Sequence, residues 1–360
     1  MNETTAENGR RPRRGHGRPT LHDVAAVAQV TRITVSRYLR EPHLVAPDTA
    51  ERIQAAIAQT GYVRNLQAGQ LASGRSRMVA ALIPNVGHSI FGESIQGLVD
   101  GLHDTEYELL LMPTGYSLER EEAQLRALAG WGPAALVITG RHHTPGALRL
   151  LRDAQQAGTP VVEIWDCSHA APAADGAPAL PQIGFDHHAV GRAVAEHLLA
   201  LGHRSLAFVA SAVSEDYRAS DRCEGFLQAV QAAGAQVRVF RANAGDVFDA
   251  GRALLGPLRS ADHGRITAVG VANDQLACGL LLEAQATGVA VPQALSVVGF
   301  GDFPLGNQMR PRLSTVRPPR EEIGRATARA LLAALDAEEP VRGCELPWQL
   351  IDRGSTGPVG

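Results

Sequence analysis

Arg32 and Ile33, followed one helical turn later by Ser36 and Arg37, are the side chains of this sequence most clearly grouped for binding another molecule. Residues three or four positions apart lie on the same face of a helix, so these four share one side of a helical segment at 31–39. Guanidinium and hydroxyl groups on one exposed face suit hydrogen bonding to a polyanion. The grouping therefore points to nucleic acid.

Three short helical patterns between Thr20 and Tyr62 must position this face. Thr20 can cap the first helix and Thr31 the second, while Pro47 suits the first turn of the third. The first two meet at a tight turn around 28–31. This arrangement predicts a helix-turn-helix, which places the early residues of its second helix in the major groove of DNA.

The charge of the chain is divided unevenly. Residues 1–77 hold 12 arginines against six acidic residues, a balance of +6, which leaves −9 for the rest of a chain whose formal net charge is −3. A basic front on an acidic body indicates an N-terminal unit that meets polyanions. Residues 1–18 are polar, rich in arginine and without periodicity, and we expect a disordered basic arm there.

The segment TLHDVAAVAQVTRITVSRYL, from Thr20 to Leu39, resembles the DNA-binding headpiece of the LacI/GalR family. Its pattern is T-[LI]-x-D-V-A-x-x-A-G-V-S-x-x-T-V-S-R-x-L. The chain departs from it at Gln29, where the family usually has glycine, and at Thr31, where serine is commoner. A left-handed conformation at Gln29 would cost roughly 1 kcal/mol.

The resemblance implies a role for each matching residue. Arg32 and Ile33 would read base edges, and Arg37 would bind a guanine, whose paired acceptors suit an arginine. The residues expected to contact phosphates or to cap helices are Thr20, Thr31, Thr34 and Ser36.

The linker NLQAGQLASGR at 65–75 resembles the hinge helix of the same family. There the hinge folds when two subunits sit together on DNA, and a pair of leucines enters the minor groove. Leu71 matches that leucine, with Asn65 and Ala68 supporting it, and an apolar wedge of this kind unstacks a base step. Packing of Leu71 on the protein core is the alternative.

After the linker, apolar runs of strand length alternate with amphipathic helical segments. This alternation is typical of parallel sheets covered on both faces, and eight strands suffice for two doubly wound sheets. The predicted strands are 78–84, 107–112, 134–139, 161–165, 205–210, 236–240, 268–272 and 296–300. The predicted helices lie near 90–104, 118–130, 146–157, 187–201, 219–233, 247–260, 274–287 and 320–336.

The body of the chain also resembles the LacI/GalR family. The matching segments are RCEGF at 222–226, VAND at 271–274, LSVVGFGD at 295–302 and RPRLSTV at 310–316. The resemblance implies an all-α helix-turn-helix headpiece plus an α/β periplasmic-binding-protein-like type I effector domain. The expected parts are an arm at 1–18, a DNA-binding domain at 19–62, a hinge at 63–77 and an effector-binding and dimerisation domain at 78–360.

Within the family the chain is most similar to the gluconate-operon repressors. The segments that carry this likeness are VTRITVSRYLREP at 30–42, TGRHHTPGAL at 139–148, VVEIWD at 161–166 and IGFDHH at 183–188. That subgroup responds to gluconate or related sugar acids. An anionic polyol needs a cation for its carboxylate and several hydrogen-bond partners for its hydroxyls.

Ligands of doubly wound sheets bind beyond the carboxyl ends of the strands, which selects the candidate effector residues. Arg222, in the RxxGF motif, matches the ligand-binding arginine of the family. Asn273 and Asp166 end two predicted strands. The residues that follow two further strands are Arg141, His142, Asn85, His88 and Phe91. Gly301 replaces an aspartate that many sugar-binding relatives carry, which would remove a negative charge from the pocket.

No P-loop, nucleophile elbow, zincin motif or suitably placed GxGxxG is present, so we expect no enzyme and no cofactor. The pairs His142–His143 and His187–His188 have no ligand partners at suitable spacing, so we expect no metal site. The four cysteines are far apart and are expected to be buried thiols in a reducing compartment.

No apolar run has the length of a membrane span and no secretory signal is visible, so we expect a cytoplasmic, nucleoid-associated protein without membrane contact. The expected partners are pseudo-palindromic operator DNA, a sugar-acid effector and a second copy of the chain. A repressor is the favoured reading. Activation, another sugar as effector, a solute receptor and a tetramer remain alternatives.

Overall fold

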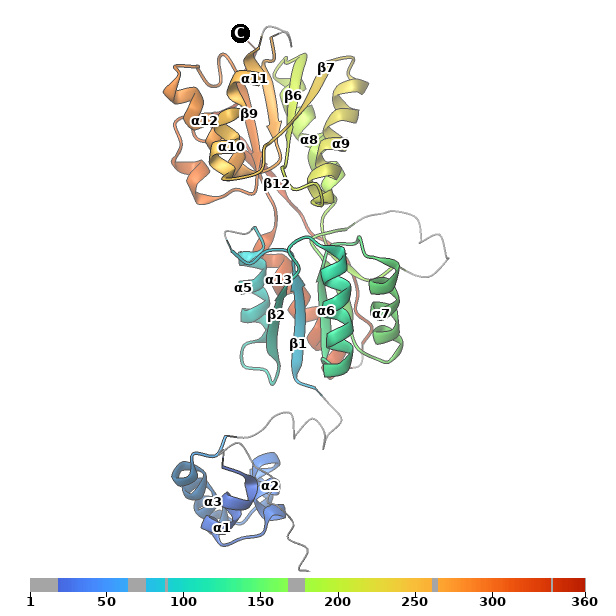
Figure 1. Ribbon diagram of the computed structural model, residues 1–360, viewed down its shortest axis with the longest axis vertical. Helices are drawn as coiled ribbons and strands as arrows, with labels where there is room; N and C mark the ends of the chain where they lie inside the picture. Colours follow the sequence, from blue (N-terminus) through green and yellow to red (C-terminus); the bar gives the residue numbers. More distant parts are fainter. Residues whose placement is uncertain are drawn as a thin grey trace, which may run out of the picture. The chain divides into compact units, whose positions relative to one another are not determined.

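The computed structural model describes residues 19–63, 76–87, 90–167, 179–260, 265–337 and 339–359. The chain divides into two compact units, Met1–Arg75 and Ser76–Gly360 (Figure 1). The predicted arm at 1–18 lies outside the described residues, as does nearly all of the predicted hinge. The candidate site residues in this position are Asn65, Ala68, Leu71 and His88.

The first unit contains the three predicted helices, α1 (Leu21–Ala28), α2 (Arg32–Arg40) and α3 (Pro47–Thr60), with a 3-10 turn, η1 (Pro42–Leu44). Their inner faces form one small core of six buried side chains. These are Val24, Ala25, Ala28, Val35, Ile53 and Ala56. The apolar spacing of each helix supplies these contacts, so the core fixes which face of α2 remains outside.

The turn between α1 and α2 depends on Gln29, whose backbone is left-handed at φ 51° and ψ 48°. The prediction from the family pattern is therefore confirmed. An L-residue with a Cβ adopts this region only at a cost that glycine avoids. Gly61, at φ 63°, ends α3 in the same conformation without that cost.

The second unit contains two six-stranded sheets with related topologies. The first has the order β11-β5-β4-β3-β1-β2 and the second β12-β10-β9-β8-β6-β7. All pairs are parallel except β10 with β12. The strands are β1 (Met78–Ile83), β2 (Glu108–Pro113), β3 (Ala135–Thr139), β4 (Val161–Ile164), β5 (Gln182–Gly184), β6 (Ser205–Ala210), β7 (Gln236–Arg241), β8 (Ala268–Val271), β9 (Ser296–Phe300), β10 (Ser314–Arg317), β11 (Cys344–Glu345) and β12 (Gln349–Ile351).

Helices flank each sheet, and the two sets form two subdomains (Figure 1). Those of the first subdomain are α5 (Gly92–Leu102), α6 (Leu118–Trp131), α7 (Pro145–Gln156) and α13 (Arg320–Asp336). Those of the second are α8 (His187–Ala200), α9 (Tyr217–Ala232), α10 (Val247–Ala253), α11 (Leu255–Arg259) and α12 (Asp274–Ala286). None of the helices in the described part of the chain combines the length and apolarity that crossing a bilayer requires.

The chain passes between the two subdomains three times: from β5 into α8, from β10 into α13, and from β11 into β12. Each passage is only a few residues long. The first ends at buried Phe185 and His187, and the second ends at buried Arg320. Short connections therefore join two sheets that share no strand pairing among the described residues.

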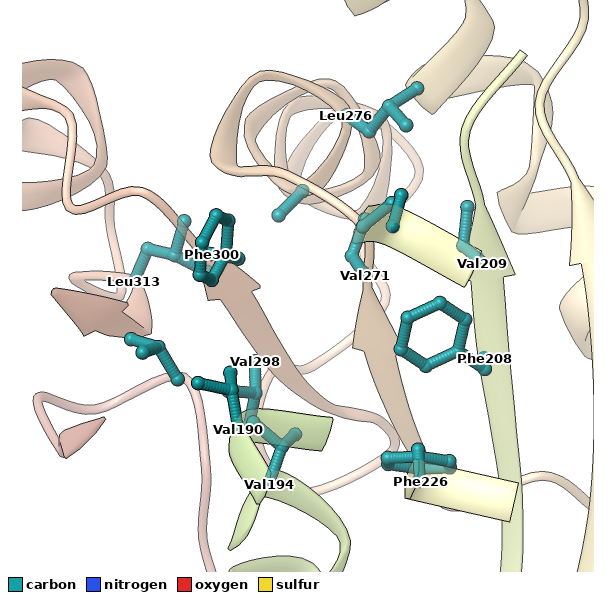
Figure 2. Packing of buried hydrophobic residues seen from close by; sticks show 14 of the residues in the cluster. Val190, Val194, Phe208, Val209, Phe226, Val271, Leu276, Val298, Phe300 and Leu313 are labelled. Carbon is teal, nitrogen blue, oxygen red and sulfur yellow. The ribbon is translucent and has the colours of Figure 1, made fainter. Parts of the chain in front are cut away.

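The core of the second subdomain extends to the carboxyl ends of its strands. Figure 2 shows Val209 on β6, Val271 on β8 and Phe300 on β9 with Phe208 and Phe226, whose ring centroids are 5.3 Å apart. The strands are apolar throughout because both faces of the sheet are covered. The rigid strand ends give fixed positions to the polar residues that follow them.

The pattern of the sequence did not predict every element correctly. It missed β5, β10, β11 and β12, each of at most four residues. The helix predicted at 247–260 is two helices, because Pro257 would clash with the turn that ends α10 at Ala253. The cysteines were not all buried as expected, since Cys278 is buried, Cys167 and Cys223 are half-buried, and Cys344 is exposed.

Candidate DNA-binding face and effector cleft

The outer face of α2 presents the residues that the sequence analysis grouped. Arg32 and Arg37 are exposed, and Ile33 retains 72% of its accessible surface, while Thr34 and Ser36 are half-buried. An isoleucine this exposed gains nothing from the headpiece core. Among residues 19–63, the two arginine side chains have no hydrogen bond or ion pair, so their donors are available to another molecule.

The threonines of the headpiece hold the helix ends. The Thr31 hydroxyl accepts a hydrogen bond from the Thr34 backbone N–H at 3.2 Å and lies 2.9 Å from the Thr34 hydroxyl, capping α2. At α1, the Asp23 carboxylate accepts from the Thr20 N–H at 2.7 Å and from its hydroxyl at 2.8 Å. The Thr20 backbone N–H lowers the pKa of Asp23. The chain entering each helix is thus fixed locally.

A cavity of 380 Å³ lies at the carboxyl ends of strands from both sheets. Its size is within the range of small-molecule sites. Asn85 follows β1, Ser211 follows β6 and Asn273 follows β8, and the order of each sheet reverses at these strands. This is the position at which doubly wound sheets bind ligands.

Arg222 lies in the wall of this cavity, on α9, and 6% of its surface is exposed. Its Nη1 lies 3.0 Å from His187 Nδ1, and its Nη2 donates to the Ala272 carbonyl at 3.0 Å. The guanidinium carbon is 3.8 Å from the centroid of the Phe300 ring. Burial lowers the pKa of Arg222 to about 10, so it remains charged at neutral pH.

His187 is neutral and its tautomer follows from its partners. Nε2 lies 2.8 Å from the carbonyl oxygen of Trp165, so Nε2 carries the proton. Nδ1 then offers its lone pair to Arg222. Burial and the charge of Arg222 hold the pKa of His187 well below its usual value. A neutral imidazole thereby supports the arginine without repelling it.

A second buried guanidinium, that of Arg218, lines the same cavity one helical turn before Arg222. It lies over the rings of Phe91 and Tyr217, at 5.5 Å and 5.0 Å from their centroids. Burial opposes its charge, but Tyr217 and Asp166 outweigh that effect and raise the pKa of Arg218. The cleft thus holds two charged arginines away from bulk water.

Four of the candidate effector residues line the cavity: Arg222, Asn273, Asn85 and Phe91. The Asn273 Oδ1 accepts from the Leu276 N–H at 2.9 Å and caps α12, which leaves its amide N–H groups for a ligand. Phe91 packs edge-on against Trp165, with centroids 5.1 Å apart. These side chains supply apolar surface and hydrogen-bond donors together.

Asp166, Arg141 and His142 do not line the cavity but contact the start of α9. The Tyr217 hydroxyl donates to Asp166 Oδ2 at 2.7 Å and accepts from the Arg141 backbone N–H at 2.6 Å. Arg141 Nη2 donates to Asp221 at 2.6 Å, and His142 stacks on Tyr217. We call these five residues the subdomain clamp, because Tyr217 and Asp221 belong to one subdomain and the other three to its neighbour.

Burial raises the pKa of Asp166, against the opposing charges of Arg218 and Arg141 and the hydrogen bond from Tyr217. Arg141 Nε lies 3.4 Å from Asp166 Oδ1. A buried carboxylate needs such partners to keep its charge. Asp166 therefore holds the two subdomains in register beside the cavity.

Several residues of the cavity were not identified from the sequence. They are Tyr116, Trp165, His187, Asp216, Arg218, Asn243, Gln275 and Phe303. One signal was available, because Arg218 and Arg222 are four residues apart and must share a helix face. Of the others, His187 and Gln275 lie in the first turns of α8 and α12, and the rest lie in the segments between helices and strands, whose course the sequence pattern does not define.

Gly301 has a local structural reason to be glycine. Its φ is +131°, and a Cβ would come within 2.8 Å of the Phe303 ring. The adjacent Asp302 pairs with Arg317 at 2.5 Å and with Arg353, away from the cavity lining. Backbone geometry thus accounts for this glycine without reference to ligand charge.

His143 forms a separate buried charge cluster in the first subdomain. Its Nδ1 lies 2.7 Å from Glu121 Oε1 and its Nε2 lies 3.0 Å from Glu163 Oε1. Burial opposes protonation, but the two carboxylates outweigh it and raise the pKa of His143 to about 9. Both ring nitrogens then donate, so the imidazolium joins α6 to β4.

Comparison with known proteins assigns both units. Residues 20–65 match the family "Bacterial regulatory proteins, lacI family", and residues 195–356 match the "Periplasmic binding protein-like domain". The chain is 36% identical to the HTH-type transcriptional regulator GntR of Pseudomonas aeruginosa, covering 94% of this chain and 96% of that protein. It is 31% identical to the regulator of the same name from Escherichia coli K12, covering 94% and 97%.

Solved structures agree with this assignment. A LacI-family transcriptional regulator from Silicibacter pomeroyi aligns with a TM-score of 0.83 at 32% identity, covering 94% of this chain and 99% of that chain. The Lac repressor dimer bound to operator aligns with a TM-score of 0.79 at 23% identity, covering 94% and 99%, and shares the fold. The relatives are named as regulators and not as enzymes. The chain therefore belongs to the LacI family of DNA-binding transcriptional regulators, with a helix-turn-helix headpiece and two α/β subdomains, as the sequence analysis predicted.

Proposed function

We propose that the protein is a dimeric repressor that binds a pseudo-palindromic operator and releases it when gluconate or a related sugar acid enters the cleft. Residues 19–62 bind DNA, 63–77 form the hinge, and 78–360 bind the effector and dimerise. The observation that carries the proposal is the pair of buried guanidinium groups, Arg218 and Arg222, in one cavity.

The outer face of α2 supports the DNA-binding part. Arg32, Ile33 and Arg37 are exposed together, and the available donors of Arg37 match the paired acceptors of guanine. Thr31, Thr34 and Ser36 lie beside them, where phosphate contacts are expected. Asn65, Ala68 and Leu71 complete the proposed interface as the minor-groove part of the hinge.

The lining of the cavity supports an anionic polyol as effector. Two arginines in a low-dielectric wall bind a carboxylate more strongly than they would in water. Asn273, Asn85 and Gln275 offer amide groups for hydroxyls, and Phe91 and Trp165 offer apolar faces. If the effector were a neutral sugar, neither Arg218 nor Arg222 would receive a carboxylate from it.

Release follows from differential binding. The cavity is lined from both subdomains, so an effector contacts both and favours one hinge angle over others. A ligand shifts the equilibrium only by its difference in affinity for the two states, and coupling of 1–3 kcal/mol changes operator affinity by about 5- to 150-fold. The same coupling must appear in effector affinity when operator is bound.

The test begins with palindromic duplexes selected by the full-length protein from a random library. Binding is then measured by fluorescence anisotropy with and without gluconate, using glucitol as the neutral control, and a reporter gene under the selected site shows the direction of regulation. We expect gluconate to lower operator affinity and to raise expression. Absence of any preference over random duplex, or no response to any sugar acid, would contradict the proposal.

A further inference from the structure

We propose that Arg218 makes the cleft selective for acids by binding the carboxylate of the effector, whereas Arg222 binds its hydroxyl groups. The inference rests on the proposed function and adds a division of roles between two arginines of one helix. It also defines the ligand class as a polyol with a single negative charge.

Arg222 has few donors left for a ligand. Both of its Nη atoms are engaged, one with His187 and the other with the Ala272 carbonyl. Its Nε is buried and has no hydrogen-bond partner among the described residues. Three of its five N–H groups are unused, but one is on the enclosed Nε and the other two are on nitrogens already held by His187 and the Ala272 carbonyl. Such donors suit single hydrogen bonds to hydroxyl oxygens, whereas a carboxylate bound in the bidentate manner requires two parallel donors.

Arg218 is arranged in the opposite way. Its Nη1 donates a long hydrogen bond to the Tyr217 hydroxyl at 3.4 Å, and Asp166 lies 3.7 Å from the same nitrogen. The Tyr116 side chain is a further hydrogen-bond partner of this guanidinium. The guanidinium also lies over the rings of Phe91 and Tyr217, contacts that do not use its N–H groups. The planar group can thus still present the fork that a carboxylate accepts.

The charges of the cavity match one carboxylate. Among the described lining residues, Arg218 and Arg222 are cationic and Asp216 is the carboxylate, while His187 is neutral. Asp216 accepts from the Ala219 N–H at 3.3 Å, which orients it along α9. The lining itself thus carries +1, and the adjacent clamp residues Arg141, Asp166 and Asp221 add one cation and two carboxylates. The surroundings of Arg218 therefore favour a singly charged acid over a doubly charged phosphate ester.

Arg218 contacts residues of both subdomains. Arg218 belongs to α9, yet its nearest neighbours include Phe91 and Asp166 of the other subdomain. Tyr116 is also close, because the charge of Arg218 lowers its pKa, although burial raises that pKa to about 12 overall. An acid group held here therefore lies between the two subdomains.

The experiment is isothermal titration calorimetry of the full-length protein with gluconate and with glucitol, which share a carbon chain and differ in the acid group. The wild type is compared with Arg218→Gln, Arg222→Gln and, as a control, Arg192→Gln on the exposed side of α8. We expect the wild type to prefer gluconate by about 10- to 100-fold, the range of hydrogen bonds to charged groups. Arg218→Gln should remove this preference, and Arg222→Gln should weaken both ligands by similar factors.

Two results would overturn this inference and leave the proposed function intact, both in a wild type that prefers gluconate. In the first, Arg218→Gln keeps the preference for gluconate. In the second, the preference is lost in Arg222→Gln and not in Arg218→Gln. A wild type that binds neither ligand would overturn the proposed function as well. Thermal unfolding and operator binding check that each variant folds. If Arg218→Gln does not fold, Arg218→Lys should lower gluconate affinity several-fold and leave glucitol affinity unchanged. Equal losses for both ligands in Arg218→Lys would count against the inference.

Discussion

On α2, Arg32 and Arg37 extend into solvent without partners in the described headpiece, whereas Arg218 and Arg222 on α9 are buried among aromatic rings, a histidine and a carboxylate. The first pair can be replaced without disturbing any packing. In the second pair, Arg218 contacts Phe91 and Asp166 of the other subdomain, and Arg222 packs into the cavity wall against His187 and the Ala272 carbonyl. The comparison shows that candidate binding residues of the first unit contribute little to its stability, whereas those of the second unit are also part of its packing.

The largest effect is expected where a buried charge loses its partner. His143→Gln leaves Glu121 and Glu163 buried without a cation, which should lower the free energy of unfolding by roughly 3–5 kcal/mol. Chemical denaturation of the wild type and of His143→Gln near pH 6 measures this difference in the free energy of unfolding. The exposed His103→Gln is the control and should change nothing, while equal effects of the two would refute the proposed role of the cluster.

The difference in stability between the wild type and His143→Gln should depend on pH. The pKa of His143 is raised to about 9 in the folded state, above the value near 6.5 of an unfolded histidine. Its stabilising contribution is complete below about pH 6.5 and is lost as the pH rises through 9. The difference between wild type and His143→Gln should therefore narrow between pH 6.5 and 9. A constant difference would show that charge is not its source.

The second effect concerns DNA alone. Arg37→Ala should reduce the preference for operator over random duplex by roughly 1–3 kcal/mol and keep weak, salt-sensitive binding. Stability should stay within about 0.5 kcal/mol, because the side chain is exposed. Anisotropy titrations measure the preference, with Arg52→Ala on α3 as control. Unchanged preference in Arg37→Ala would mean that another face of the headpiece meets the bases.

The third effect tests the subdomain clamp. Tyr217→Phe removes the donor to Asp166 and the acceptor for the Arg141 N–H, and should lower stability by about 1–3 kcal/mol. The hydroxyl is outside the cavity lining and its contact with Arg218 Nη1 is long, at 3.4 Å, so the ratio of gluconate to glucitol affinity should change little. Loss of that ratio without loss of stability would place the hydroxyl in the ligand site.

The smallest effect is at the headpiece turn. Gln29→Gly should relieve the left-handed strain and stabilise α1 and α2 by about 0.5–1 kcal/mol, whereas Gln29→Ala keeps the Cβ and should give no gain. Hydrogen exchange of the amides of these helices in the full-length protein resolves the difference. Equal protection in both variants would show that the turn is not strained.

Elements that depend on local patterns of residues could be predicted from the sequence. The cap at Thr31, the start of the third helix at Pro47 and most strands followed from spacing and residue type, since each depends on neighbours within a few positions. The left-handed Gln29 followed from the family resemblance. Short strands such as β11 escaped because two residues carry no periodicity.

The cleft was harder to predict. Four candidate residues line it, but Asp166, Arg141 and His142 contact the start of α9 instead. Two residues at strand ends can be recognised as neighbours of a crevice, yet the direction of each side chain depends on partners up to 80 positions away, as for Arg141 and Asp221. Only the spacing of Arg218 and Arg222 on one helix could have revealed the second arginine.

The three short passages between the subdomains have a mechanical consequence. Two subdomains joined by three short connections can rotate about a hinge at these connections, but they cannot easily slide past one another or separate. A molecule that binds between the two subdomains can therefore change only the hinge angle between them. If the proposed function is correct, altering a few side chains of the cavity lining would change which effector binds and leave the permitted motion of the two subdomains the same.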